Sequence, residues 1–218
     1  MSAPVYVVLG AGPGLGLAVA RRFAEEGYVA VLATRTVADA EPLAATLEAE
    51  GHRAQGVGVD LTDPDDVTAV ISGIGDKYGR IDVLHFNPSA WREKDPLHLT
   101  VAELLEDVTL GAGALLPAVQ AARPFMTSGA RVLVTGSAAA DKPSAAAASL
   151  GVQKAAVRNL VTSLDATLAP DGIRAVAVQI NGVLGREGAF SPPPIAATMW
   201  AAVSRTDDEW SPHVPYDG

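Results

Sequence analysis

The chain of 218 residues contains no cysteine, which excludes disulfide bonds, thiolate catalysis and cysteine-ligated metals. Its four histidines are His52, His85, His98 and His213. No two of them have the HxxxH or HxH spacing with which paired histidines bind zinc. The sequence therefore predicts a protein without a metal site.

Positive charge and long apolar runs are also scarce. The chain has 16 Lys and Arg against 25 Asp and Glu, a formal net charge of -9. Nucleic acids and anionic membrane surfaces attract clustered basic residues, so neither is an expected partner. No stretch approaches the roughly 18 consecutive apolar residues of a membrane span, and glycines interrupt the apolar start of the chain. The sequence indicates a cytoplasmic protein that binds a small-molecule substrate or ligand.

The chain alternates short β-branched runs with longer helical patterns. Predicted strands cover residues 4–9, 28–33, 55–59, 81–86, 131–135 and 173–180. Predicted helices cover residues 14–26, 38–50, 101–124 (with a kink at Pro117) and 150–169, and a further helix begins within residues 62–66. Apolar strands separated by helices are typical of a doubly wound α/β fold, a parallel sheet of Rossmann type sandwiched by helices. Residues 1–182 would form this dinucleotide-binding domain, and residues 183–218 an arm or lid of the same domain rather than another βα unit.

A glycine-rich segment, Gly10-Ala11-Gly12-Pro13-Gly14-Leu15-Gly16, joins the first predicted strand to the first helix. In this fold class, backbone amides and a helix N-terminus approach a pyrophosphate at that point. The spacing is GxxxGxG; Leu15 breaks the GxGxxG pattern, and no GK[ST] follows. An ordinary turn is the alternative, but the placement favours a cofactor loop made of Gly10, Gly12, Pro13, Gly14, Leu15 and Gly16.

The end of the second predicted strand discriminates between nicotinamide cofactors. NAD-binding proteins usually place a carboxylate there for the ribose 2′-OH. This chain instead has Thr34-Arg35-Thr36, with no acid. The guanidinium of Arg35 suits a 2′-phosphate, and the two threonines could add hydroxyl donors. A solvated loop arginine is the alternative; the prediction is NADP(H) in preference to NAD(H).

With these motifs in place, residues 4–182 resemble the short-chain dehydrogenase/reductase family. Asp60-Leu61 is similar to the pair whose aspartate meets the adenine, and Asn87 to the retained asparagine of the DVLVNNAG segment. Gly182 and Val183 begin the loop beside the nicotinamide, where Asn181 replaces the usual proline. The resemblance also implies a homo-oligomer, a dimer or tetramer, built on the helices at about 101–124 and 150–169.

The family's catalytic unit combines Asn, Ser and a YxxxK pair, in which tyrosine moves the substrate proton. By this resemblance Ser137 matches the serine, and Lys154 matches the lysine that also binds the nicotinamide ribose. Leu150 stands at the tyrosine position and Thr109 at the asparagine position. Because a positioned acid contributes roughly 10²–10⁴ in rate, loss of the tyrosine affects the chemistry more than cofactor binding.

Two interpretations of function follow. One is an NADP-dependent oxidoreductase with an atypical active site, in which water, a substrate group or His98 replaces the tyrosine. The other is a catalytically inactive NADP(H)-binding sensor or partner subunit.

Other residues also carry open alternatives. His98 is a surface histidine if it is not the acid, and His85 is expected to be a packed core residue. Residues 91–94 form either a pocket rim or a solvated turn. Met199 and Trp200 either cover the substrate cleft or make an oligomer contact.

Overall fold

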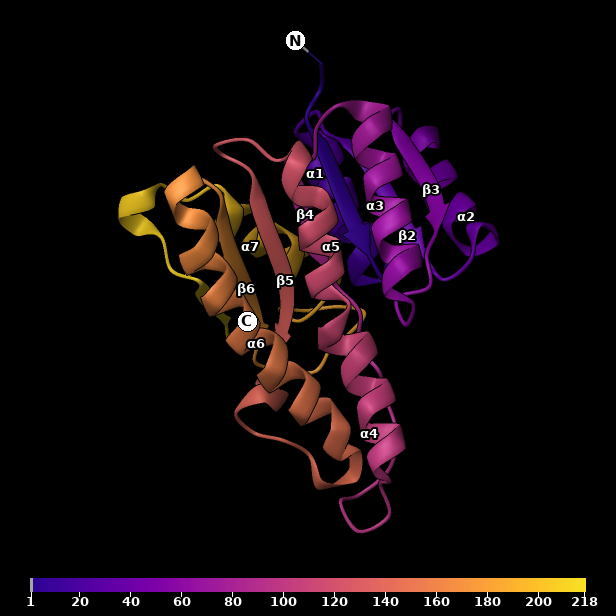
Figure 1. The fold of residues 1–218 in the computed structure, drawn as a ribbon, viewed down its shortest axis with the longest axis vertical. Helices are drawn as coiled ribbons and strands as arrows, with labels where there is room; N and C mark the ends of the chain where they lie inside the picture. Colours follow the sequence, from indigo (N-terminus) through magenta and orange to yellow (C-terminus); the bar gives the residue numbers. More distant parts are fainter. Residues whose placement is uncertain (1) are drawn as a thin grey trace.

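The computed structural model describes residues 2–218 as one seven-stranded parallel sheet, with the strand order β3-β2-β1-β4-β5-β6-β7 and helices on both faces (Figure 1). The strands are β1 (Val5–Leu9), β2 (Val29–Thr34), β3 (Ala54–Gly58), β4 (Val83–Phe86), β5 (Arg131–Ser137), β6 (Arg174–Ile180) and β7 (His213–Tyr216). All six pairings are parallel. The predicted doubly wound α/β fold is therefore confirmed.

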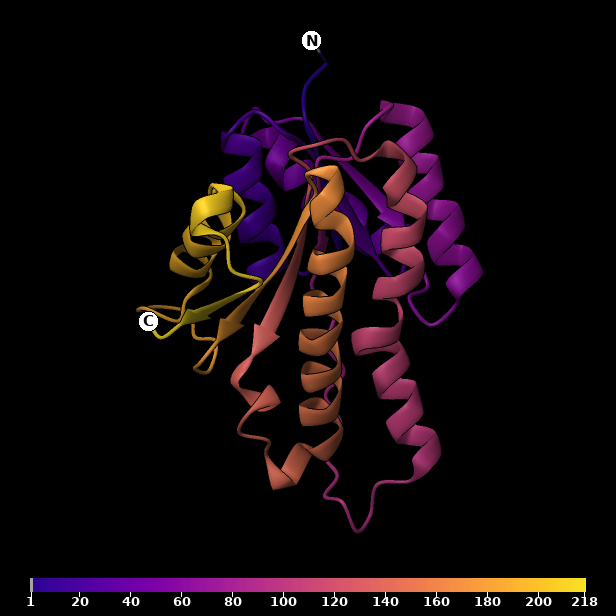
Figure 2. The same cartoon turned by 60° about the vertical axis from the view of Figure 1, so that its left-hand side comes forward.

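The helices bury an apolar core on each face of the sheet. They are α1 (Leu15–Glu25), α2 (Val37–Ala49), α3 (Pro64–Tyr78), α4 (Val101–Val108), α5 (Leu115–Ala122), α6 (Ala148–Leu168) and α7 (Pro192–Val203). Helices α3, α5 and α6 cover one face, and α1, α2 and α7 cover the other (Figures 1 and 2). No helix within residues 2–218 is long and apolar enough to cross a membrane.

Helix α3 shows how local sequence fixes an element. Asp63 caps its N-terminus by accepting hydrogen bonds from Asp65 N and Asp66 N, and Pro64 occupies the first turn. Gly79 ends the helix in the left-handed region, with φ of 72°. The predicted helix start in residues 62–66 is confirmed.

The predicted helix over residues 101–124 is interrupted, but not at Pro117. A π-helical turn over residues 109–113 separates α4 from α5, and Pro117 lies in the first turn of α5. Pro117 has no amide proton to donate to Gly113 O four residues earlier, and the π-helical turn ends at Gly113. The predicted interruption of this helix therefore lies in the turn before Pro117 rather than at Pro117 itself.

The C-terminal segment was expected to be an arm or lid, and this prediction is wrong for residues 192–216. Helix α7 packs on α1, and β7 extends the sheet by pairing with β6, so the segment is a further βα unit. Met199 is fully buried, and Trp200 packs edge-on against Phe23 and Tyr28. Met199 therefore belongs to the buried α1–α7 core and is not available to cover a cleft or contact another subunit, whereas Trp200 packs at the edge of this core and is half-buried.

Candidate functional site at the carboxyl edge of the sheet

The glycine segment turns sharply between β1 and α1. Gly10 has φ of 75°, and a Cβ atom there would lie 3.0 Å from Pro88 N, so both conformation and space require glycine. At Gly12 and Gly14 an added Cβ would meet nothing within 4 Å, which leaves the backbone open on that side. Helix α1 has no side-chain cap and no acid in its first turn. An anionic group fits this turn, because it would meet the positive dipole end of α1 and the amides that precede Leu17, whose own N donates to Gly12 O at 2.9 Å.

A cleft with a volume of about 670 Å³ opens beside this turn, at the carboxyl ends of β1, β2, β3 and β4. It brings together five of the residues predicted from sequence to bind cofactor, namely Gly10, Arg35, Asp60, Leu61 and Asn87. Arg35 is exposed at the mouth of the cleft. The sequence motifs of four separate segments thus converge on one hollow.

Asp60 is held by local hydrogen bonds at the end of β3. Its Oδ1 accepts from the hydroxyl of Thr62 at 2.6 Å and from Thr62 N at 2.8 Å. These hydrogen bonds lower the pKa of Asp60, and the positive charge of Arg35 adds to the effect. The carboxylate is therefore ionised and pre-oriented at the cleft wall.

The two threonines that flank Arg35 are not free donors. The Thr34 hydroxyl donates to Thr36 O at 2.6 Å, and the Thr36 hydroxyl donates to Asp39 Oδ2 at 2.6 Å. Thr36 also accepts from Asp39 N as the N-cap of α2. A hydroxyl has one proton to give, so the expectation that both threonines add donors for a phosphate is wrong, and Arg35 is left as the donor at this position.

Lys154 is buried between α6 and the ends of β4 and β5. Its Nζ donates to Pro88 O at 3.2 Å and to Thr135 O at 3.1 Å, and only 4% of the residue is exposed. Burial lowers the pKa of Lys154 to about 8. An ammonium has three protons, so one remains for a ligand.

The remaining predicted site residues lie on separate elements. Leu150 lies in the first turn of α6, one turn before Lys154. Ser137 is the last residue of β5, and its Oγ accepts from Ala139 N at 3.2 Å. Gly182 and Val183 follow β6, where Val183 is 89% exposed. Thr109 is exposed and begins the π-helical turn after α4.

The segment between β4 and α4 is fixed by buried polar contacts that sequence reasoning missed. The Gln153 amide pairs with the backbone of Ala90, accepting from Ala90 N at 2.9 Å and donating to Ala90 O at 3.0 Å. Gly111 makes room for it, since a Cβ there would lie 2.0 Å from Gln153 Oε1. Gln153 is one residue from Lys154, but nothing in the local pattern distinguishes such a glutamine from a surface residue.

The rest of that segment is tied to α4 by charge. Arg92 donates two hydrogen bonds of 3.0 Å to Asp107, and its pKa is raised by this pairing. Trp91 is 66% exposed. His98 is exposed and hydrogen-bonded to Asp95 at 2.9 Å, which makes it part of a surface turn. Of residues 91–94, Trp91 and Glu93 are exposed, whereas Arg92 and Lys94 are partly buried and paired with acids of α4.

His85 is fully buried in β4, which confirms the expectation of a core residue. It is not packed only among apolar groups, however. Its ring nitrogens lie 2.6 Å from the hydroxyl of Tyr6 and 2.9 Å from that of Thr135. Burial, together with the charge of Lys154, lowers the pKa of His85 to about 3, so the ring is neutral.

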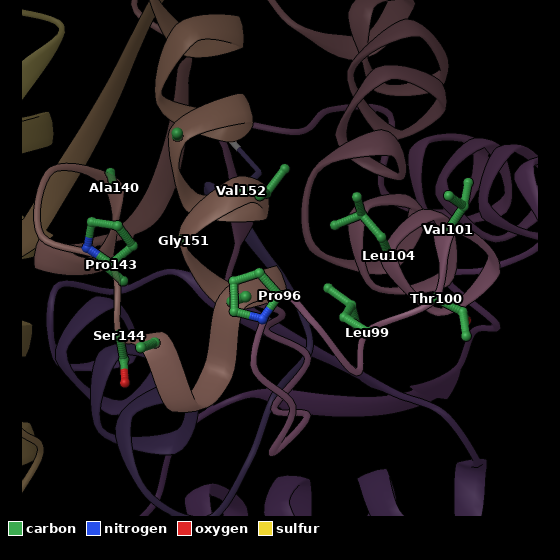
Figure 3. Close-up of a pocket in the computed structure, with 14 residues that line it drawn as sticks. Pro96, Leu99, Thr100, Val101, Leu104, Ala140, Pro143, Ser144, Gly151 and Val152 are labelled. Atoms are coloured by element: carbon green, nitrogen blue, oxygen red, sulfur yellow. The ribbon is translucent and has the colours of Figure 1, made fainter.

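A second hollow lies between α4 and α6, and no residue of the glycine turn lines it (Figure 3). It has a volume of about 690 Å³ and mostly apolar walls. The walls include Leu99, Val101, Leu104, Pro143, Ala148 and Val152. Val101 is 73% exposed and Val152 is 47% exposed, so this face is apolar and uncovered in the single chain.

Comparisons with known proteins agree with this geometry. A family model described as short chain dehydrogenase matches residues 4–186. Cis-4-hydroxycyclohexanecarboxylate dehydrogenase from Sinomonas cyclohexanicum is 36% identical over 200 residues, covering 90% of this chain and 80% of that protein. A dehydrogenase/reductase from Sinorhizobium meliloti 1021 superposes with a TM-score of 0.90 at 22% identity, covering 100% of this chain and 95% of that one. A metagenomic short-chain oxidoreductase in complex with NADP has a TM-score of 0.86 at 25% identity, covering 97% and 96%.

Proposed function

Because the chain belongs to the short-chain dehydrogenase/reductase family, we propose that it is an oxidoreductase that binds NADP(H) in the cleft at the carboxyl edge of its sheet. The observation that carries the preference for NADP(H) is the cleft mouth, where Arg35 stands at the end of β2 and no carboxylate accompanies it on that strand. The solved NADP complex of a 25% identical neighbour supports the same cofactor.

The residues divide the binding task by chemistry. The glycine turn and the N-terminus of α1 would receive the pyrophosphate, and Arg35 the 2′-phosphate. Asp60 would accept from the adenine amino group, and Asn87, Gly182 and Val183 would border the nicotinamide half. Lys154 would donate its remaining proton to a ribose hydroxyl. When bound, the nicotinamide supplies or accepts a hydride.

Isothermal titration with NADPH and NADH tests this assignment. Wild type should bind NADPH more tightly, and Arg35→Ala should raise the Kd for NADPH by about 10- to 100-fold, because charge-assisted hydrogen bonds are lost. The Kd for NADH should stay nearly unchanged. Arg53→Ala, at an exposed arginine beside Gly27, is the matched control. Equal affinity of wild type for the two cofactors would refute the preference.

The atypical part of the proposed site is the group that donates a proton to the substrate. Leu150 has none to give, and Ser137 can hydrogen-bond a ligand oxygen without replacing an acid. Lys154 holds a proton with a pKa near 8, within one helical turn of Leu150. The ribose hydroxyl takes the one proton that Lys154 has left, so a water that relays a proton from Lys154 is the candidate donor to the substrate.

The second candidate function is a catalytically inactive NADP(H)-binding sensor or partner subunit. Two observations favour it: Leu150 at the family's tyrosine position, and the engagement of Lys154 Nζ with two backbone carbonyls. NADPH oxidation should be followed with a panel of ketones, quinones and enones that includes 4-oxocyclohexanecarboxylate, chosen from the name of the 36% identical relative. Turnover in wild type that Lys154→Ala abolishes supports the enzyme, whereas turnover that appears only in Leu150→Tyr supports the sensor.

We also propose that a second copy of the chain packs on the hollow between α4 and α6, giving a homo-oligomer. The exposed valines Val101 and Val152 and the small residues of α6 support this, because they allow two helices to approach closely over an apolar patch.

A further inference from the structure

A continuous chain of buried hydrogen bonds connects the interior of the sheet to the glycine turn. It begins with Tyr6 on β1, whose Oη lies 2.6 Å from His85 Nδ1 on β4. His85 Nε2 lies 2.9 Å from Thr135 Oγ1 on β5. Thr135 Oγ1 lies 2.6 Å from Asn87 Oδ1, and Asn87 Nδ2 donates to Gly10 O at 2.8 Å. Three strands and the cofactor turn are thus joined by side chains of one face of the sheet.

The direction of every bond in this chain follows from its last member. A backbone carbonyl only accepts, so Asn87 must present its NH₂ group to Gly10 and its carbonyl oxygen to Thr135. The single hydroxyl proton of Thr135 is then used on Asn87, and Thr135 must accept from His85. His85 is therefore the Nε2–H tautomer, and its Nδ1 accepts from the Tyr6 hydroxyl.

The surroundings of His85 show that this ring replaces what would otherwise be an apolar residue. Its partners across the sheet in register are Val8 and Leu133, and Val83 precedes it on the same face of β4. A polar ring at this depth is tolerated only with both nitrogens satisfied, and Tyr6 and Thr135 satisfy them. Tyr6 in turn is fully buried, stacked on Phe23 at a centroid distance of 4.2 Å.

The far end of the chain lies against the cofactor turn on two sides. Asn87 Nδ2 holds Gly10 O, and a Cβ at Gly16 would come within 3.4 Å of the same nitrogen. Thr135 also contributes its backbone oxygen to Lys154 Nζ. Rotation of the Thr135 or Asn87 side chain would change the hydrogen bond to the glycine turn. A shift of the Thr135 backbone would change the hydrogen bond to Lys154.

We propose that His85, with Tyr6 as its hydrogen-bond donor, is a positioning residue for the cofactor cleft: as the neutral Nε2–H tautomer it orients Thr135 and Asn87, and Asn87 fixes the glycine turn. The inference rests on the proposed function, since it assigns the turn to NADP(H). The residue that determines the geometry of the turn, His85, then lies inside the sheet. It is separated by Thr135 from Asn87, which lines the cleft.

The tautomer is measured directly by ¹⁵N-detected NMR of imidazole-labelled protein without cofactor. His85→Phe identifies the His85 signals among those of the four histidines. The expected result is a neutral ring with a protonated Nε2 and an accepting Nδ1, unchanged from pH 6 to pH 8. A protonated Nδ1, or a charged ring in this range, would overturn the proposal whether or not the protein binds NADP(H).

The positioning role is tested with an isosteric pair at Thr135. Thr135→Val removes the hydroxyl and interrupts the chain, whereas Thr135→Ser keeps it. Thr135→Val should accelerate amide hydrogen exchange of residues 10–16 without cofactor and raise the Kd for NADPH about 5- to 20-fold, and Thr135→Ser should restore both to within about twofold of wild type. Equal behaviour of the two variants would refute the role.

Tyr6→Phe and Phe23→Leu separate positioning from stability. Tyr6→Phe deletes one buried oxygen and keeps the stack, and Phe23→Leu weakens the same stack without touching the hydrogen bonds. Both should lower Tm, but only Tyr6→Phe should accelerate exchange of residues 10–16 and weaken NADPH binding. Faster exchange in Phe23→Leu as well would mean that the turn responds to core stability alone, contrary to the proposal. If wild type bound no NADP(H), the proposed function would fail, and the exchange data would still decide the role of His85 in the turn.

Discussion

Lys154 should lower the unfolding free energy of the cofactor-free protein, although the proposed cofactor site needs this residue. Its pKa falls from the ordinary 10.5 to about 8 because the ammonium is buried. At about 1.4 kcal/mol per pKa unit, holding the charged form in the folded state at pH 7 costs about 3 kcal/mol. Replacing Lys154 by Met would also leave Pro88 O and Thr135 O without their donor, which costs about 1 kcal/mol for each carbonyl. Lys154→Met, which fills similar space without charge, should therefore stabilise the cofactor-free protein by about 1 kcal/mol at pH 7.

The lowered pKa of Lys154 also predicts how the stability of the two proteins changes with pH. Between about pH 8 and 10.5 the unfolded chain retains a proton on Lys154 that the folded protein has released. The unfolding free energy of wild type should therefore rise with pH through this window, and the advantage of Lys154→Met should shrink. Urea denaturation at pH 7 and pH 10 measures the difference in unfolding free energy between wild type and Lys154→Met. The other titrating groups are the same in both proteins and cancel in this difference.

A matched control is Lys142→Met, at an exposed lysine of the turn between β5 and α6. It should change stability little at either pH. The reasoning would be refuted if Lys154→Met were less stable than wild type at pH 7, or if its advantage did not depend on pH. The same variant should bind NADPH more weakly, because the remaining proton of Lys154 is lost with the charge.

Three further predictions concern other parts of the molecule. Asp165→Ala should lower the unfolding free energy by about 3 kcal/mol in urea at pH 7, because Arg174 and Ala175 N lose a buried partner. Burial opposes ionisation of Asp165, but these hydrogen bonds outweigh it and lower its pKa, so the contribution is complete above the ordinary 3.8 and should decline as pH falls below it. Gly111→Ala should displace Gln153 from Ala90 and reduce Tm by several degrees, with Gly73→Ala, at a glycine with open space around it, as control. Val152→Glu should convert the proposed oligomer to monomer in light scattering without reducing NADPH affinity; an unchanged mass would place the subunit contact elsewhere.

Local sequence predicted most of the architecture. Six strands and most helices begin and end within two or three residues of their expected positions, because apolar β-branched runs, caps and glycine stops act over short distances. The failures lie where tertiary packing decided. At the break after α4, Gly111 lies against Gln153 of the distant helix α6, and α7 was missed because Trp200 packs against Phe23 of α1, far away in the chain.

The candidate site divides in the same way. Arg35, Asp60 and Asn87 could be chosen from the sequence, because parallel strands end at one edge and each residue follows a predicted strand. Thr34 and Thr36 were misjudged, since their hydroxyls donate to Thr36 O and to Asp39 in the first turn of α2, partners that were overlooked in the sequence.

By itself, then, the sequence determined the layered fold, the glycine turn and the residue types at the sheet's edge, all of which depend on near neighbours along the chain. Only the tertiary structure decided the state of His85 and Lys154. Their partners Tyr6, Thr135 and Pro88 are 19 to 79 residues away in the chain, and the depth that makes one ring neutral and one amine weakly basic exists only when the strands have been paired. Burial and hydrogen-bond direction are properties of the packed molecule, and no pattern of residue types contains them.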